Sequence, residues 1–154
     1  MENIETLVKM AQGYDMFVRL DMEDHRVTED TIQVMLDMHQ KGLTNVGVVL
    51  QGRLFRTLDD IERIKEILGP NADYRICKGI YLEPEEISHT DRKPIIDATN
   101  KCIDAMLDAG AYVGVASHDY PVVNHTIAAL ESRGMGPNKS CLLYTSDAAD
   151  DDRG

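Results

Sequence analysis

Basic residues are scarce in this 154-residue chain, and their scarcity excludes one large class of partner. Lysine and arginine together number 16, against 27 aspartates and glutamates, which gives a formal net charge of −11 at pH 7. Acidic residues stay in excess when residues 141–154 are set aside. Because a phosphate backbone needs a basic surface, we expect no nucleic-acid partner.

Long apolar runs and paired cysteines are also lacking. No run approaches the roughly 20 apolar residues that a membrane-spanning helix needs, and the first residues, MENIETL, show neither the basic nor the apolar part of a signal peptide. The three cysteines, Cys77, Cys102 and Cys141, have no metal-site spacing and no evident partners. Reduced thiols are the simplest account of them, so we expect a cytoplasmic protein.

The end of the chain changes character abruptly. Residues 141–154 read CLLYTSDAADDDRG, and they resemble the translated end of a sequencing adapter; a natural acidic tail is the alternative. We therefore predict a domain over residues 1–140 and a non-native tail over residues 141–154. We expect the tail to make few contacts with the strands.

Strands and helices alternate along the rest of the chain. Short β-branched runs predict strands at residues 16–22, 45–51 and 111–117, and a further strand opens at Asp73 and breaks at Gly79. Apolar residues at helical spacing predict helices that lie between them. The first helix ends at Gly13, and the others cover residues 28–41, 57–68, 94–107 and 119–133. Strict alternation calls for parallel strands with right-handed crossovers.

Two details of the helices follow from residue type. Thr28 and Thr57 stand where helices begin, and threonine is a favoured N-terminal cap, so we expect both to cap their helices. Ile67 falls on the apolar stripe of the helix over residues 57–68, so we expect it to be buried.

Glycine-rich nucleotide-binding motifs are missing. No GxGxxG sequence follows the first strand and no P-loop occurs, so the usual sequence marker of an open nucleotide-binding sheet is absent.

Each predicted strand has one apolar face, and its other face turns polar toward the C-terminal end. The parallel strands of open α/β sheets, in contrast, are usually apolar on both faces. We predict an α/β fold, a partial (β/α)8 TIM barrel with four parallel strands; an open doubly wound sheet is the alternative.

Polar side chains therefore collect at one end of the predicted strands. Because catalytic residues of such barrels lie at the C-terminal rim, the shared polarity of four strands favours a site there. Plainer interpretations remain open: His118 as a hydrogen-bonded loop residue, and Asp21 as a carboxylate that neutralises Arg19 or Arg75. The residues expected to converge are Asp21, Gln51, Arg75, Tyr81 and His118.

Four segments resemble the proline dehydrogenase family in its short bacterial form. They are residues 18–24 (VRLDMED), 45–51 (NVGVVLQ), 75–84 (RICKGIYLEP) and 111–119 (AYVGVASHD). Their order and spacing match the second to fifth strands of that family's (β/α)8 barrel. The resemblance implies flavin-dependent oxidation of L-proline to 1-pyrroline-5-carboxylate, a step of proline catabolism.

The resemblance also implies roles for individual residues. Asp21 and Arg75 become active-site residues, with Arg75 beside the flavin N5, where its charge stabilises the reduced isoalloxazine. Tyr81 is implied to pack against the substrate ring, and Gly79 lets the cofactor approach the backbone closely. The positions that contact FAD are Met22, Gln51, Lys78, Gly79, Ile80, Ser117 and His118.

Some residues depart from the family pattern. Ile80 replaces a usual alanine, and Ser117 replaces a threonine but keeps the hydroxyl. Gly52 and Arg53 replace a small residue followed by an aromatic one, so we expect Arg53 to alter the rim of the pocket. The family's first-strand lysine, its later strands and the paired arginines that hold the proline carboxylate have no counterpart in residues 1–140. We therefore expect an inactive fragment of an enzyme.

The sequence also leads to expectations about partners and leaves two alternative functions open. The resemblance implies proline as substrate and an electron acceptor, for which a membrane quinone is one candidate; a peripheral position at the inner membrane face is the alternative to a purely cytoplasmic one. A different barrel enzyme would bind a divalent metal through Asp21, Glu23 and His118, since carboxylates and imidazole suit Mn, Fe or Zn. A non-catalytic binding barrel is the third possibility.

Overall fold

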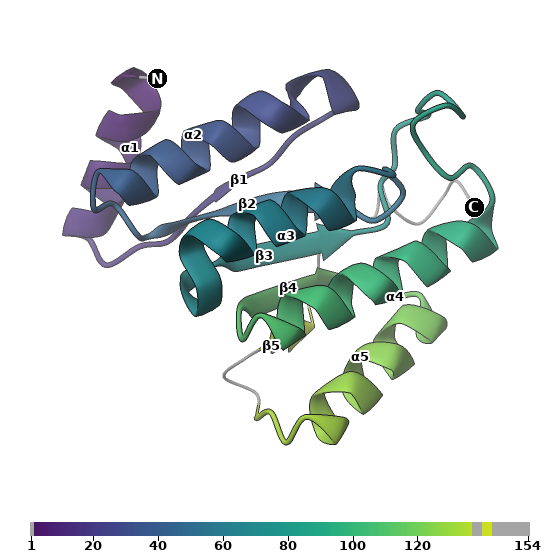
Figure 1. The fold of residues 1–154 in the computed structure, drawn as a ribbon. Coiled ribbons are helices and arrows are strands. Elements are labelled where there is room, and N and C mark those ends of the chain that lie inside the picture. The colour runs from purple at the N-terminus through teal and green to yellow at the C-terminus, as the bar shows by residue number, and fades with distance from the viewer. Residues whose placement is uncertain (1, 137–139, 143–154) are drawn as a thin grey trace. The chain divides into compact units, whose positions relative to one another are not determined.

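Helices and parallel strands alternate along the chain, as the sequence predicts. The computed structural model describes residues 2–136 and 140–142, and the chain divides into two units, Met1–Val49 and Leu50–Gly154. Strand β2 (Val46–Gln51) crosses the boundary between them. Figure 1 shows the elements in chain order.

The first unit is held together at the point where β2 begins. It contains α1 (Glu2–Gly13), β1 (Val18–Leu20), the 3-10 helix η1 (His25–Val27), α2 (Thr28–Gln40) and the start of β2. β1 runs parallel to β2, with Val18 opposite Val46. The Asn45 side-chain amide donates to the carbonyls of Val8, at 3.1 Å, and Met16, at 3.0 Å, and so joins α1 and the approach to β1 to the start of β2. The buried core of this unit includes Val8, Ile32, Met35, Leu36, Met38, Val46 and Val48.

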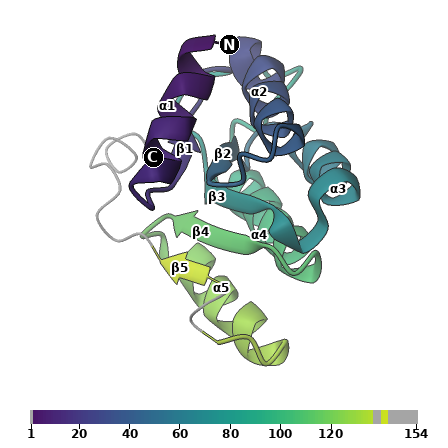
Figure 2. The same cartoon turned by 90° about the vertical axis from the view of Figure 1, so that its left-hand side faces the viewer.

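The second unit has a helix layer on one face of its strands. It contains α3 (Thr57–Leu68), the 3-10 helix η2 (Gly69–Asn71), β3 (Asp73–Cys77), α4 (Arg92–Asp108), β4 (Tyr112–Ala116), α5 (Tyr120–Ser132) and β5 (Ser140–Leu142). β3, β4 and β5 lie side by side in that order and are parallel. α4 packs against α3 and α5 and contacts β3 and β4. Figure 2 shows α4 and α5 on the same side of β4 and β5.

Burial along β3 follows this layering. Tyr74 and Ile76 are completely buried, whereas Arg75 and Cys77 are half-buried. Side chains alternate between the faces of a strand, so the apolar face is covered and the arginine lies on the other face. The alternation predicted for this strand is confirmed, although the strand ends at Cys77, just before the predicted break.

Two cysteines have described side chains, and neither Cys77 nor Cys102 forms a disulfide. Cys102 lies inside the helix layer on α4, and burial raises the pKa of its thiol to about 12. None of the helices among the described residues has the length and apolar character to cross a membrane.

Both predicted threonine caps are wrong. α2 and α3 have Val27 and Arg56 at their N-cap positions, without a side-chain hydrogen bond from either. The Thr28 hydroxyl instead donates to the Met22 sulfur at 3.0 Å, and the Thr57 hydroxyl donates to the Gln51 carbonyl at 2.6 Å. Tertiary partners therefore bind the hydroxyls that the local pattern assigned to the helix ends.

The expected burial of Ile67 is also wrong. Its side chain is 51% exposed on α3, while Ile61 and Ile64 are fully buried. The packing therefore covers Ile61 and Ile64 but leaves Ile67, near the C-terminal end of α3, exposed.

A fifth strand was not expected from the sequence. β5 pairs in parallel with β4, with Ser140 opposite Val113, Cys141 opposite Gly114 and Leu142 opposite Val115. The expectation that residues 141–154 make few contacts with the strands is therefore wrong for Cys141 and Leu142. Residues 143–154 lie outside the described part of the chain, and the non-native origin of the tail stays a prediction.

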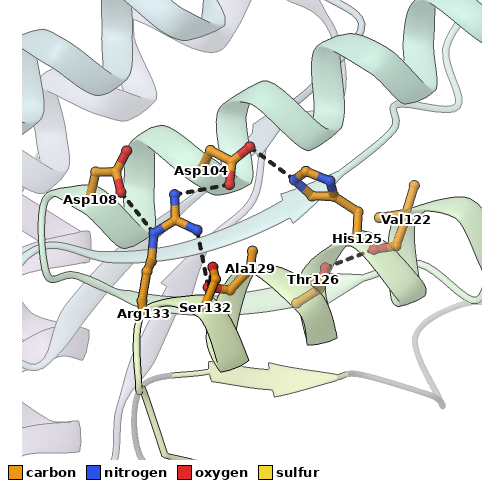
Figure 3. A network of polar contacts seen from close by, with 8 residues as sticks. All are labelled: Asp104, Asp108, Val122, His125, Thr126, Ala129, Ser132 and Arg133. Atoms are coloured by element: carbon orange, nitrogen blue, oxygen red, sulfur yellow. Dashed lines mark hydrogen bonds and ion pairs between the residues drawn. The ribbon is translucent and has the colours of Figure 1, made fainter.

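A network of charged side chains joins α4 to α5 (Figure 3). The Arg133 guanidinium binds the Asp108 carboxylate at 2.7 Å and the Asp104 carboxylate at 3.0 Å. His125 lies 2.9 Å from the other oxygen of Asp104, and Arg133 also donates to the Ala129 carbonyl at 3.0 Å. The hydrogen bond from Arg133 lowers the pKa of Asp108 and, in return, raises the pKa of Arg133.

Candidate functional site

Arg75 lies on the strand face opposite the helix layer. It is paired in register with Gly114 of β4, so the neighbouring strand presents no side chain next to it. A half-buried guanidinium on this face is suited to binding a planar or anionic group. Arg75, one of the two predicted catalytic residues, is therefore held within the sheet.

The loops after β3 and β4 meet through one carboxylate. Asp119 accepts a hydrogen bond from the Lys78 ammonium at 3.2 Å and from the Arg92 guanidinium at 2.7 Å. The backbone N–H of Asp119 donates to the Ser117 hydroxyl at 3.2 Å. Two of the predicted site residues, Lys78 and Ser117, are thus brought together at the C-terminal ends of adjacent strands.

Sequence reasoning assigned Asp119 only to the start of a helix. It is indeed the N-cap position of α5, but its side chain makes no capping hydrogen bond. The carboxylate is only 7% exposed and serves the two cations instead. Its position directly after a strand, at the same end as Lys78, is the signal that would have identified it.

Gly79 is the second residue of the segment that leads out of β3. Its φ angle is +99°, and a Cβ atom there would lie 2.8 Å from both the Arg53 Cδ and the Gln51 Oε1. A side chain at this position would therefore be strained and would collide with its neighbours. The glycine is required by the protein's own packing, in addition to any approach of a cofactor.

Gly52 makes a second close approach. A Cβ atom on Gly52 would lie 2.2 Å from the Thr99 hydroxyl oxygen and 2.8 Å from the Thr99 Cα. The small residue at this position therefore lets α4 lie directly against the end of β2.

Ile80, Tyr81 and His118 complete the predicted set in the second unit. Tyr81 is 42% exposed, and Ile80 and His118 are half-buried. Gln51, at the end of β2, is 3% exposed and lies next to Gly79. All of these residues stand at or just after the C-terminal ends of their strands.

Asp21 and Met22 belong to the first unit and follow β1. Asp21 is exposed, whereas Met22 is 4% exposed and its sulfur accepts the hydrogen bond from Thr28. Met22 therefore anchors the start of α2 as well as standing at the predicted cofactor position.

The metal-site alternative has no support within the described residues. No group of three histidine, cysteine, aspartate or glutamate side chains among them is arranged to hold a metal ion. Asp21 and Glu23 follow β1 in the first unit, and His118 follows β4 in the second.

Known proteins share this sequence pattern. A sequence model described as Proline dehydrogenase matches residues 3–145. The chain is 31% identical over 137 residues to a proline dehydrogenase of Deinococcus radiodurans, a match that covers 88% of this chain and 43% of that protein. It is 28% identical over 138 residues to proline dehydrogenase 2 of Bacillus subtilis, covering 90% of this chain and 44% of that protein. The chain thus spans less than half the length of these relatives.

A solved structure shares the fold. The crystal structure of proline utilization A (PutA) from Bdellovibrio bacteriovorus inactivated by N-propargylglycine matches 90% of this chain with a TM-score of 0.82, at 17% sequence identity and over 16% of that chain. At this identity the likeness concerns the fold alone. The predicted fold class, a partial (β/α)8 barrel of parallel strands alternating with helices, is confirmed.

Proposed function

The chain belongs to the proline dehydrogenase family, and on this basis we propose that it forms part of an enzyme that oxidises L-proline to 1-pyrroline-5-carboxylate with FAD as cofactor. The observation that carries the proposal is the half-buried Arg75 on the strand face opposite the helix layer. A fixed positive charge there is what a reaction that builds up negative charge on a planar cofactor requires.

The residues present fit a flavin in their chemistry. Arg75 is a cation in the middle of β3, Lys78 is a cation directly after the strand, and Asp119 holds the Lys78 ammonium in one position. Gly79 presents backbone without a side chain, and Ser117 offers a hydroxyl. FAD, when bound, supplies the acceptor for the hydride that proline loses as its C5–N bond becomes a double bond.

Each residue has a distinct task in this proposal. Arg75 supplies charge next to the reacting part of the cofactor, and Asp21 is the second catalytic residue. Tyr81 packs against the proline ring and excludes water from it. The remaining cofactor contacts are Met22, Gln51, Lys78, Gly79, Ile80, Ser117 and His118. The electrons pass on to an acceptor for which a membrane quinone is our candidate.

Replacement of Arg75 by methionine in the complete gene product tests the proposal. The wild-type protein is expected to show flavin absorbance at about 450 nm that proline bleaches. The Arg75→Met change should slow this bleaching about a hundredfold, because one charged donor aimed at developing charge is typically worth about 3 kcal/mol. Stopped-flow absorbance measures the rate.

A matched control separates charge at the site from charge in general. Arg133→Met removes the same charge from the α4–α5 network (Figure 3) and should leave the bleaching rate unchanged. Equal rates for wild type and Arg75→Met would contradict the assignment of Arg75. A complete gene product without flavin absorbance, with or without a bound metal, would contradict the proposed function itself.

A further inference from the structure

Arg53 is a buried cation that no role proposed so far uses. It follows β2 directly and is only 5% exposed. A guanidinium carries five N–H donors and no acceptor, and burying a charge is costly unless it is well hydrogen-bonded. Its partners therefore indicate what the residue is for.

Within the described part of the chain, the Arg53 side chain donates only to carbonyls of one segment, the β3–α4 connection (residues 78–91). Nη1 donates to the carbonyls of Gly79, at 3.4 Å, and Tyr81. Nε and Nη2 donate to the carbonyl of His89, at 3.3 and 3.2 Å. One guanidinium thus joins the beginning of the connection to its end.

The backbone around Arg53 binds the same segment. Arg53 N–H donates to the Lys78 carbonyl at 3.0 Å, and His89 N–H donates to the Arg53 carbonyl at 2.9 Å. Phe55 N–H donates to the Ile87 carbonyl at 2.9 Å. The residues after β2 therefore lie along both ends of the connection, with the guanidinium between them.

The stem of Arg53 also fills the space that Gly79 leaves. Its Cδ lies 2.8 Å, and its Cγ 3.0 Å, from the position that a Cβ atom on Gly79 would occupy. Gly79 has a left-handed backbone, with φ of +99°. The arginine and the glycine therefore fit each other, and together they determine the path of the chain as it leaves β3.

From these contacts we infer that Arg53 is a positioning residue, which clamps the β3–α4 connection and sets the backbone of Gly79, Ile80 and Tyr81 for ligand binding. It touches neither cofactor nor substrate and acts through the carbonyls that it holds. The inference rests on the proposed function only in its second half, since those three residues are the proposed flavin and proline contacts.

Hydrogen exchange tests the clamp without any ligand. Arg53→Met keeps the stem but removes all four hydrogen bonds, and Arg53→Lys keeps the charge but cannot reach both ends of the connection at once. In the 154-residue chain, the amides of Phe55 and His89 should exchange about tenfold faster in both variants. Arg133→Lys is the matched control and should leave these amides unchanged.

Ligand binding by the complete gene product tests whether Arg53 positions the proposed flavin and proline contacts. Arg53→Met should raise the FAD dissociation constant about tenfold, and Arg53→Lys should lie between it and the wild type. In FAD-saturated protein the change should raise the KM for proline more than it lowers kcat, because Tyr81 is displaced while Arg75 is not.

The outcomes separate the two proposals. Unchanged exchange of Phe55 and His89 in both Arg53 variants would overturn the clamp. Faster exchange with unchanged FAD affinity and unchanged KM would overturn the positioning role. A wild-type protein that binds no FAD would overturn the proposed function, while the exchange result would still decide whether the clamp exists.

Discussion

At Gly79 two independent constraints act on one residue. Its φ of +99° is rare for any side-chain-bearing residue, and the space where a Cβ atom would lie is taken by Arg53 and Gln51. The first constraint is a property of the backbone and the second a property of the packing. The costs of the two constraints can be separated, because other glycines have a positive φ but enough space for a Cβ atom.

We expect Gly79→Ala to lower the free energy of unfolding by about 3 kcal/mol, about 1 from the left-handed backbone and the rest from overpacking. Gly134→Ala is the control, since Gly134 has a φ of +62° and no atom within 4 Å of the added Cβ. It should cost about 1 kcal/mol. Urea denaturation measures both; equal losses would mean that Arg53 and Gln51 move aside.

At the residue scale the sequence predicts positions better than contacts. The alternation of β3 placed Arg75 on the polar face, and the structure agrees. Asp119 was missed as a site-forming residue, and Arg53 was expected only to alter the rim of the pocket, because the partners of both are distant in sequence. Asp119 binds Lys78 and Arg92, and no local pattern indicates which loops a charged side chain will join.

At the scale of elements, residue patterns were sufficient to predict strands β1 to β4 and helices α1 to α5, but not β5. The helices α2 and α3 begin at Thr28 and Thr57, as predicted, although neither threonine caps its helix. Their hydroxyls bind Met22 and the Gln51 carbonyl, and such tertiary partners are invisible in a local pattern. β5 (Ser140–Leu142) begins at the last residue of the predicted domain and runs into the segment that was excluded as a tail, so it was not predicted.

The α4–α5 network leads to a prediction about how the free energy of unfolding changes at low pH. Arg133 lowers the pKa of Asp108 from its ordinary value of 3.8, so the stabilisation is present above that pH and is lost as the pH falls through the lower, folded-state pKa. Asp108→Asn should therefore cost about 0.5 kcal/mol at pH 7, a small value because the Asp108 side chain is 62% exposed.

Unfolding measurements at a series of pH values test whether the Asp108–Arg133 ion pair stabilises the fold. Urea unfolding of wild type and Asp108→Asn should give free energies that converge as the pH is lowered below the ordinary aspartate pKa of 3.8. Asp97→Asn on the same helix is the control, since Asp97 pairs within α4 with the exposed Lys93. A difference for Asp108→Asn that stays constant across the series would show that its ion pair does not stabilise the fold.

At the scale of the whole molecule, the family match covers most of the chain, but the chain lacks residues that the resemblance assigns to catalysis. The sequence model matches residues 3–145, yet the chain covers only 43% of the Deinococcus radiodurans relative. The resemblance assigns the proline carboxylate to paired arginines that have no counterpart in residues 1–140. The residues described above are therefore proposed to supply charge and cofactor contacts, without the arginines that the resemblance assigns to that carboxylate.

We accordingly expect the 154-residue chain by itself to show no proline oxidation, although it carries Asp21, Arg75 and Lys78. Catalysis of this kind depends on holding the reacting carbon against the cofactor, and misplacement by about 1 Å can cost a hundredfold in rate. The measurement is reduction of an artificial electron-accepting dye by the purified chain with added FAD and proline. The full-length relative from Deinococcus radiodurans serves as the positive control. Dye reduction by the chain should stay at the level seen without proline; a rate that depends on proline and approaches the control would mean that residues 1–154 hold the substrate without those arginines.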